Sequence, residues 1–264
     1  MQVREAEPQA RRHTNTFLTM HIDVITIFPE MFAPILGASI LKRAQESGRL
    51  RIAVHDLRRF THDRHHSVDD RPYGGGPGMV MRVEPITEAI EAIKRDCAER
   101  SANTPRCQTI LMSPQGERCS APLAKELSTC DHLILICGHY EGVDERVRLS
   151  IVDREVSVGD YVLTGGELPA MVVIDCLSRF IPGVIGHEQA TDEESFEAGR
   201  LEYPQYTRPP VFRDMAVPEV LLSGDHERIA QWRAQQSMAK TLAARPDLVK
   251  NAQGSTLEGT ASSF

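Results

Sequence analysis

Apolar residues follow one another along the chain in two alternating patterns, short continuous runs and longer segments with helical spacing. The run I-D-V-I-T-I-F at residues 22–28 is β-branched and nearly continuous, which is typical of a strand buried on both faces. Between Pro29 and Gly48 the apolar residues recur at helical spacing, which predicts a helix over residues 30–47. The same reasoning predicts strands at residues 50–57, 109–112, 133–137 and 151–156, and helices at 84–100, from 120 onward, at 167–180 and at 221–250.

Strands that alternate with helices predict an α/β fold built on a mostly parallel sheet. Ligands of such sheets bind at the carboxyl ends of the strands. Here those ends are polar, glycine-containing loops that follow Met112, Cys137 and Val156. We therefore expect the functional site at these three loops.

The pattern changes toward both ends of the chain. Residues 1–19 have no apolar periodicity and are expected to form an extension that precedes a main domain at residues 20–185. Residues 186–199 carry five carboxylates and few apolar side chains, which indicates a flexible acidic linker. Residues 200–250 have helical spacing, with seven basic and five acidic side chains from residue 208 onward, and predict a small basic helical domain before a tail at 251–264.

Composition narrows the protein class. The 264 residues are 41% hydrophobic and 25% charged, values that argue against a disordered or fibrous chain. The net charge of -7 does not favour broad, non-specific binding of nucleic acid, although it is compatible with a local basic face. No apolar run has the roughly 18–20 residues that span a bilayer, and the first residues lack the apolar stretch of a secretory signal. We expect a cytoplasmic protein with no membrane partner.

Metal binding is not predicted. None of the six cysteines forms a C-x-x-C pair or has the spacing of a zinc ligand set, so we expect reduced, structural thiols. The histidines at positions 62, 65 and 66 lie among carboxylates, but Arg64 and Arg71 intrude, and we interpret this stretch as a polar loop that is solvated or faces RNA.

A glycine-rich string, D-D-R-P-Y-G-G-G-P-G-M, occupies residues 69–79. Its glycines and prolines define a fixed backbone path that another segment or a ligand can approach closely. It lacks the lysine and hydroxyl residue of a P-loop and the position of a dinucleotide fingerprint. The string is either a structural turn or part of a site.

The three strand-end loops have a common chemistry. They comprise S-P-Q-G at residues 113–116, G-H-Y-E-G at 138–142 and V-G-D-Y-V-L-T-G-G at 158–166. Together they predict one pocket built largely from backbone N–H and C=O groups, which suits an adenine ring and a ribose. No lysine converges there, so a triphosphate is not expected.

These strings closely resemble the bacterial tRNA (guanine-N1)-methyltransferases of the TrmD type. The resemblance rests on DDRPYGGGPGM, SPQG, GHYEGVDERV, SVGDYVLTGGELPAM, SRFIPGVIG, LEYPQYTRP and VPEVLLSGDHERIAQWR, in one order over residues 20–248. It implies a SPOUT-type α/β domain with a deep trefoil knot, a homodimer, and a helical C-terminal domain that binds tRNA. The implied reaction is transfer of a methyl group from S-adenosyl-L-methionine to N1 of guanosine at tRNA position 37, next to the anticodon.

Carried over motif by motif, the resemblance assigns cofactor-binding residues to the three loops. They are Pro114, Gly138, Tyr140, Glu141, Val158, Gly159, Asp160, Tyr161, Val162, Leu163, Gly165 and Gly166.

The resemblance also implies two catalytic residues. N1 of neutral guanine carries a proton, so a base must remove it while a cation stabilises the charge that grows on O6. The family's arginine corresponds to Arg179, at the end of the predicted helix 167–180. Its aspartate base corresponds to Glu194, where this chain reads E-E-S-F, and Asp192 is the rival candidate.

The RNA partner is expected to be the anticodon stem-loop of tRNA. Arginines should neutralise its phosphates, namely Arg58, Arg59, Arg64, Arg71 and Arg208. Because the base lies in the acidic linker, we expect that segment to be poorly ordered until tRNA binds. Two alternatives remain open, a methyltransferase with another RNA target and an RNA-binding protein that has lost catalysis.

Overall fold

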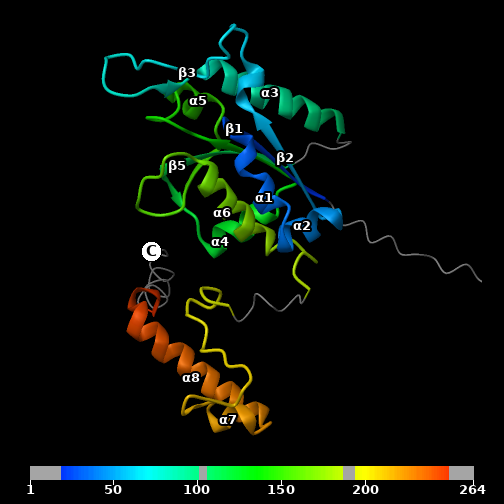
Figure 1. Cartoon of the computed structure of the whole chain (residues 1–264), viewed down its shortest axis with the longest axis vertical. Coiled ribbons are helices and arrows are strands. Elements are labelled where there is room, and N and C mark those ends of the chain that lie inside the picture. The colour runs from blue at the N-terminus through cyan, green and yellow to red at the C-terminus, as the bar shows by residue number, and fades with distance from the viewer. Residues whose placement is uncertain (1–18, 101–105, 187–193, 250–264) are drawn as a thin grey trace, which may run out of the picture. The chain divides into compact units, whose positions relative to one another are not determined.

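The computed structural model describes residues 19–100, 106–186 and 194–249 (Figure 1). Residues 1–18 of the predicted extension, the predicted tail at 251–264 and residues 187–193 of the predicted linker, which include Asp192, lie outside the described residues. The expected ordering of the linker is therefore not described either. The chain divides into two compact units, Met1–Arg118 with Thr129–Ile174, and Cys119–Ser128 with Asp175–Phe264.

The first unit is built on a five-stranded sheet, and each pair of neighbouring strands is parallel, as predicted. The order across the sheet is β2-β1-β6-β5-β7. The strands are β1 (Met20–Thr26), β2 (Leu50–Asp56), β5 (Cys107–Arg118), β6 (His132–Cys137) and β7 (Arg154–Ser157). All six residues of the central strand β6 are buried, which explains its continuous apolar run.

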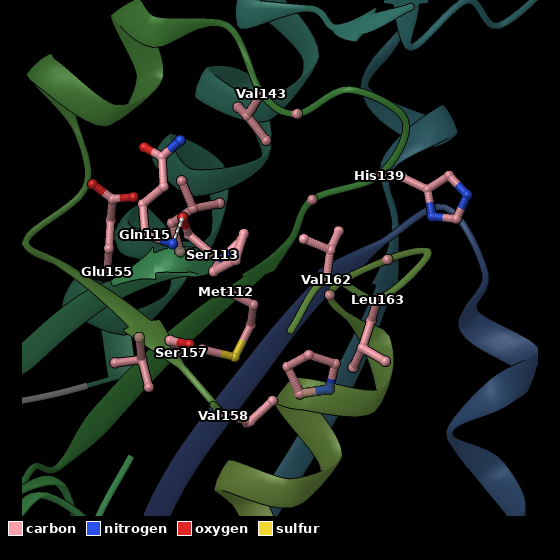
Figure 2. A pocket seen from close by; sticks show the side chains of 18 of the residues that line it. Met112, Ser113, Gln115, His139, Val143, Glu155, Ser157, Val158, Val162 and Leu163 are labelled. Atoms are coloured by element: carbon pink, nitrogen blue, oxygen red, sulfur yellow. Dashed lines mark hydrogen bonds between the residues drawn. The ribbon is translucent and has the colours of Figure 1, made fainter. Parts of the chain in front are cut away.

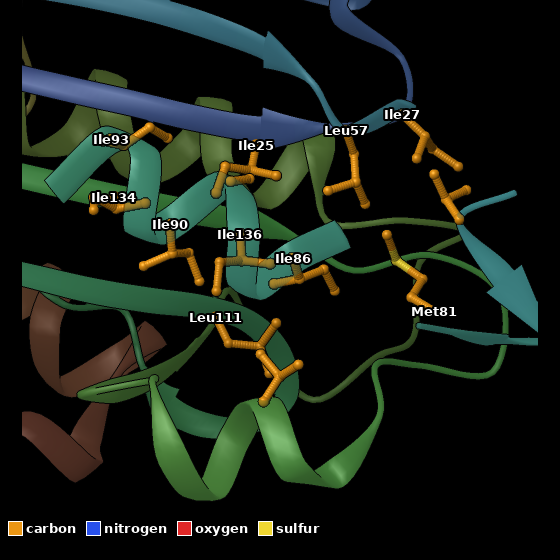
Figure 3. Close-up of a cluster of buried hydrophobic side chains, with 13 residues drawn as sticks. Ile25, Ile27, Leu57, Met81, Ile86, Ile90, Ile93, Leu111, Ile134 and Ile136 are labelled. Atoms are coloured by element: carbon orange, nitrogen blue, oxygen red, sulfur yellow. The ribbon is translucent and has the colours of Figure 1, made fainter. Parts of the chain in front are cut away.

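Helix α3 (Val83–Arg100) supplies much of the core on one face of this sheet (Figure 3). Its residues Ile86, Ile90 and Ile93 recur at helical spacing and are at most 4% exposed. They belong to one buried cluster with strand residues such as Ile25 and Ile134, to which the short helix α5 (Glu145–Ser150) adds Val147. The apolar period of residues 84–100 thus encodes both the helix and its packing face.

The prediction of a single helix over residues 30–47 is wrong. The structure has a 3-10 turn η1 (Pro29–Met31) and two helices, α1 (Ala33–Leu36) and α2 (Ser39–Glu46). The amide of Gly37 closes α1 on the carbonyl of Ala33, Ala38 is extended, and Ser39 has a positive φ of 49°. Both helices bury apolar residues, so the apolar periodicity continues although the helix is interrupted at residues 37–38.

Strand β5 continues past its predicted end at residue 112. Its pairing with β7 shifts register between Met112 and Glu117, and both of these residues pair with Val156. Residues 113–116 therefore bulge out of the ladder rather than forming a separate loop. The long aperiodic stretch after β2 contains a 3-10 turn η2 (Leu57–Phe60) and a small antiparallel pair, β3 (Asp69–Asp70) with β4 (Val80–Met81).

The second unit is largely helical in its described part. It contains α4 (Ala121–Ser128), the end of α6 (Glu167–Ser178), a small hairpin of β8 (Val211–Phe212) and β9 (Met215–Ala216), and the helices α7 (Glu219–Leu222) and α8 (His226–Ala244). The long helix predicted from residue 221 is therefore interrupted. Gly224 has a positive φ of 73°, and the Asp225 carboxylate then caps α8 by accepting a hydrogen bond from the amide of Arg228. Across all described residues, no helix is both long and apolar enough to cross a membrane.

Candidate active site

A cavity of about 250 Å³ opens at the bulge of strand β5 and at the carboxyl ends of β6 and β7 (Figure 2). Met112, Ser113 and Gln115 come from β5, His139 and Val143 follow β6, and Ser157 and Val158 lie at the end of β7. Val162 and Leu163, from the loop before α6, complete the wall. The three loops that the sequence indicated therefore converge, because the carboxyl ends of parallel strands share one edge of the sheet.

The bulge at residues 113–116 depends on a close backbone contact. A Cβ atom at Gly116 would collide with the backbone of Glu155 and Val156 in β7. The Ser113 hydroxyl accepts a hydrogen bond from the amide of Gln115 at 3.2 Å, which closes the turn. Glycine is required at position 116 because two chain segments pass each other without room for a side chain.

The glycine-rich string supports the loop after β6. Near the end of the string, the carbonyl of Met79 accepts a hydrogen bond from the amide of Glu141 at 3.0 Å. Just beyond the string, in β4, the amide of Met81 donates to the carbonyl of Gly142 at 2.9 Å, and the carbonyl of Met81 accepts from the amide of Asp144 at 3.0 Å. The string is thus not an isolated turn, and it does not line the cavity itself. It fixes the backbone of the loop after β6, and that loop lines the cavity.

Tyr140 is the strained residue of that loop. Its φ is 61°, in the left-handed region that a tyrosine seldom adopts. Its ring stacks edge-on against His139, with the centroids 5.0 Å apart. Burial and the neighbouring Asp69 carboxylate raise the pKa of Tyr140 above its ordinary value.

The loop after β7 is tied directly to the loop after β6. The amide of Gly166 donates to the carbonyl of Gly138 at 2.7 Å. A Cβ atom at Gly166 would lie 2.7 Å from the Cα atom of Cys137, so only glycine permits this contact. The next residue, Glu167, is 2% exposed, and its carboxylate accepts a hydrogen bond from the Thr26 hydroxyl at 2.8 Å. The base of the cavity is therefore a backbone-to-backbone junction anchored by a buried acid.

The charges around the cavity favour a cation over a polyphosphate. Its described lining contains three carboxylates, of Glu141, Glu145 and Glu155, and one guanidinium, of Arg148, but no lysine. Arg148 is ion-paired with Glu145 and lies 3.6 Å from Glu155. Its positive charge is already balanced, so it offers little attraction to an anionic ligand.

One buried polar atom in the lining lacks a partner. The Nδ1 atom of His139 is buried and makes no hydrogen bond in the described structure, and the nearest carboxylate oxygen, of Glu167, is 3.8 Å away. Such an atom costs free energy unless a ligand or water satisfies it. The cavity therefore has the unmet hydrogen-bonding capacity of a binding site.

A second constellation lies in the other unit. The guanidinium of Arg179, one residue beyond the end of α6, donates a hydrogen bond to the carboxylate of Glu194 and forms an ion pair with it. About one third of each side chain is exposed. The helix predicted at 167–180 ends two residues early, which leaves Arg179 on a turn rather than on the helix.

The family model described as tRNA (Guanine-1)-methyltransferase TrmD matches residues 20–251 of the chain. The chain belongs to this family. A protein from Moorella thermoacetica is 56% identical over 230 residues, which cover 87% of this chain and 90% of that protein. Relatives from Carboxydothermus hydrogenoformans (56% over 231 residues; 88% of each chain) and Geobacillus kaustophilus (50% over 230 residues; 87% of this chain and 91% of that protein) are similar. All three are named tRNA (guanine-N(1)-)-methyltransferase.

Most cofactor residues inferred from the TrmD family motifs line the cavity. The ten that do so are Pro114, Gly138, Tyr140, Glu141, Val158, Tyr161, Val162, Leu163, Gly165 and Gly166. Gly159 and Asp160 do not line it, and the Asp160 carboxylate turns outward to pair with Arg118 at 2.6 Å. The motifs missed the lining residues Met112 and Glu155, because strand residues next to a loop carry no signal of their own. They also missed Pro169, which lies within a quoted motif but on the first turn of α6.

The arginines expected to contact RNA divide into two groups. Arg59, Arg64, Arg71 and Arg208 are exposed. Arg58 is half-buried: its guanidinium donates to the carbonyl of Ile27 and lies 3.7 Å from Asp56. Arg58 is thus already engaged within the fold and has less freedom than the others to reach a phosphate. No group of three or more potential ligands among the described residues could hold a metal ion.

Proposed function

We propose that this protein transfers a methyl group from S-adenosyl-L-methionine to N1 of guanosine 37 in tRNA. The observation that carries the reaction class is the match of the TrmD family model over residues 20–251. The methyl donor, the tRNA position, a knotted SPOUT-type domain, a homodimer and a cytoplasmic location are the finer parts of this proposal.

The cavity at the strand ends is the proposed donor site. When bound, S-adenosyl-L-methionine supplies a methyl group on a positively charged sulfur atom. The excess of carboxylates over free cations in the lining suits a cationic ligand. The backbone groups around Gly138 and Leu163, with the free Nδ1 of His139, offer the few polar contacts that an adenosine group needs. Gly159 and Asp160 act indirectly in this proposal, through the shape of their loop.

The Arg179–Glu194 pair is the proposed catalytic pair. The Watson–Crick edge of guanine presents the acceptor O6 beside the donor N1–H, and a guanidinium next to a carboxylate offers the complementary donor and acceptor. Glu194 would accept the N1 proton, and Arg179 would stabilise the negative charge on O6. Glutamate is one methylene longer than the family's aspartate but has a similar intrinsic pKa, so the substitution conserves the chemistry.

The dimer and the knot are supported by two features of the first unit. Leu168 and Val172 lie one turn apart on α6 and are 49% and 52% exposed, so they form an apolar stripe that a second copy of the chain could cover. The close backbone passages at Gly116 and Gly166 are what a tightly threaded chain requires.

Methylation of defined tRNA transcripts tests the proposal. Purified full-length protein with S-adenosyl-L-methionine should form 1-methylguanosine in a transcript with guanosine at position 37, and none when that base is adenosine. Mass spectrometry of nuclease digests identifies the product and its position. Methylation at another position would favour a different RNA target, and tRNA binding without any product would favour an RNA-binding protein that has lost catalysis.

A further inference from the structure

A second and larger cavity lies within residues 203–233 of the second unit. Its volume is about 550 Å³, within the usual range of roughly 300–1,000 Å³ for sites that take small organic groups. The residues that line it come from the segment before β8, the strand-to-helix connection around α7, and the first turns of α8. They are Tyr203, Pro204, Gln205, Tyr206, Thr207, Arg208, Pro210, Val217, Leu221, Leu222, Ile229, Trp232 and Arg233.

Aromatic rings and arginines dominate the chemistry of this cavity. The rings of Tyr206 and Trp232 lie with their centroids 6.3 Å apart at an angle of 56°. The guanidinium of Arg233 lies over the ring of Tyr203, 4.7 Å from its centroid. The charged residues of the described lining are both arginines, Arg208 and Arg233. The cavity therefore combines flat π surfaces with positive charge.

One donor in the cavity has no acceptor. The Nε atom of Arg233 is buried and makes no hydrogen bond in the described structure. A buried guanidinium nitrogen without an acceptor is unfavourable, and a ligand that brings a carbonyl oxygen or a ring nitrogen would satisfy it. This atom points to an occupant with an acceptor and not to a purely apolar one.

The segment around the cavity buries little of its own surface. Of the described residues 194–249, Thr241 alone is buried. Tyr206 is 49% exposed, and Phe212, Met215 and Leu222 are each more than half exposed. So much exposed apolar and aromatic surface beside an open cavity is typical of a region that a partner covers.

We propose that this cavity binds an unpaired nucleobase of the tRNA substrate, separate from the guanine that is methylated. Unpaired bases in RNA are recognised by stacking on aromatic rings and guanidinium planes and by hydrogen bonds to their edges. In this cavity the base stacks on Trp232 and accepts a hydrogen bond from Nε of Arg233. The inference rests on the proposed function, because it takes tRNA as the substrate.

The fluorescence of tryptophan provides a direct test, because Trp232 is the single tryptophan in the chain. Full-length protein is titrated with the tRNA transcript that carries guanosine 37, at constant salt and without methyl donor. Stacking of a base on Trp232 should quench and saturate the emission, with the same dissociation constant as filter binding gives. Saturable tRNA binding that leaves the emission unchanged would overturn the proposal.

Two arginines of α8 provide a matched pair of variants. Arg233→Met and Arg228→Met remove the same charge from the same helix, but Arg228 is exposed and does not line the cavity. Arg233→Met should raise the dissociation constant for tRNA on the order of 10-fold, whereas Arg228→Met should change it only about 2- to 3-fold, as for a single phosphate contact. Equal effects of the two variants would show a purely electrostatic surface and overturn the proposal.

Substitution of the tryptophan separates stacking from folding. Trp232→Ala should weaken tRNA binding about 10- to 100-fold, and Trp232→Phe should recover most of it, since a phenyl ring still stacks. Circular dichroism checks that both variants keep their helices, and if the alanine variant does not fold, the arginine pair decides. Methylation by the wild-type protein is measured separately. A failure of the proposed base site is therefore distinguishable from a failure of the proposed reaction.

Discussion

The carboxylate of Glu194 accepts a hydrogen bond from the guanidinium of Arg179, although fifteen residues separate them in the sequence. Sequence patterns alone left Glu194 and Asp192 as rival bases; Glu194 has a guanidinium partner, and Asp192 lies outside the described residues. A carboxylate beside a guanidinium is a proton acceptor next to a cation, which is the pair of groups that deprotonation at N1 of guanine requires.

The first prediction concerns this pair. Glu194→Gln should lower the single-turnover rate of methyl transfer about 10²–10⁴-fold, because the amide cannot take up a proton. Glu194→Asp should retain most of the rate, since it restores the residue typical of the family. Asp192→Asn is the matched control and should be nearly silent. If Glu194→Gln were nearly as active as wild type while Asp192→Asn was not, the base would be Asp192.

The second prediction concerns the junction between two loops of the cavity. Gly166→Ala introduces a Cβ atom 2.7 Å from the Cα atom of Cys137, and the backbone must move to accommodate it. We expect affinity for S-adenosylhomocysteine, measured by calorimetry, to fall at least about 10-fold, or about 1.4 kcal/mol. Gly186→Ala is the control, because a Cβ atom there meets nothing within 4 Å. Unchanged affinity in the Gly166 variant would separate this cavity from the donor site.

Sequence patterns were reliable where local and global structure agree. The β-branched run at residues 22–28 and the apolar run at 133–137 form buried central strands, because a parallel sheet covered on both faces needs continuous apolar residues. The position of the cavity was predictable for a related reason, since polar loops at the carboxyl ends of parallel strands must converge.

The remaining features depend on contacts that no local pattern contains. The glycine-rich string and β4, which follows it, support the loop after β6 through hydrogen bonds from Met79 and Met81 to residues about sixty positions later. The continuation of β5 to Arg118 depends on a register shift against β7, and polar residues 113–118 carry no strand signal. The break before Ser39 leaves the apolar period intact, so periodicity could not locate it. Long-range pairing decided each of these features.

The third prediction concerns the pH dependence of stability. The buried carboxylate of Asp23 accepts hydrogen bonds from Nε2 of His55 at 2.5 Å and from Nε2 of His132 at 2.6 Å. Burial alone would raise the pKa of Asp23, but the two imidazoles outweigh it and hold the pKa well below its usual range. A lowered folded-state pKa stabilises the fold fully above the unfolded value of about 4, and this contribution is lost as the pH falls further.

Asp23→Asn should therefore lower the free energy of unfolding at pH 7 by about 1.5–3 kcal/mol, because the amide cannot accept both hydrogen bonds as a carboxylate does. Urea denaturation at several pH values measures the difference from wild type, which should shrink as the pH falls below about 4. Glu46→Gln, which removes an exposed ion pair with Lys42, is the control and should cost under about 1 kcal/mol. A constant difference across this pH range would contradict the assignment.

The fourth prediction concerns the thiol of Cys176, near the end of α6. A hydrogen bond from the thiol of Cys119 lowers the pKa of Cys176 to about 7, and the charge of Arg179 acts in the same direction against the effect of burial. The rate of alkylation by iodoacetamide at Cys176, followed by peptide mass spectrometry, should therefore rise with a midpoint near pH 7. Cys119→Ala removes the donor and should move that midpoint up toward the usual value of about 8.5. A midpoint that is the same in both proteins would show that the two thiols do not interact.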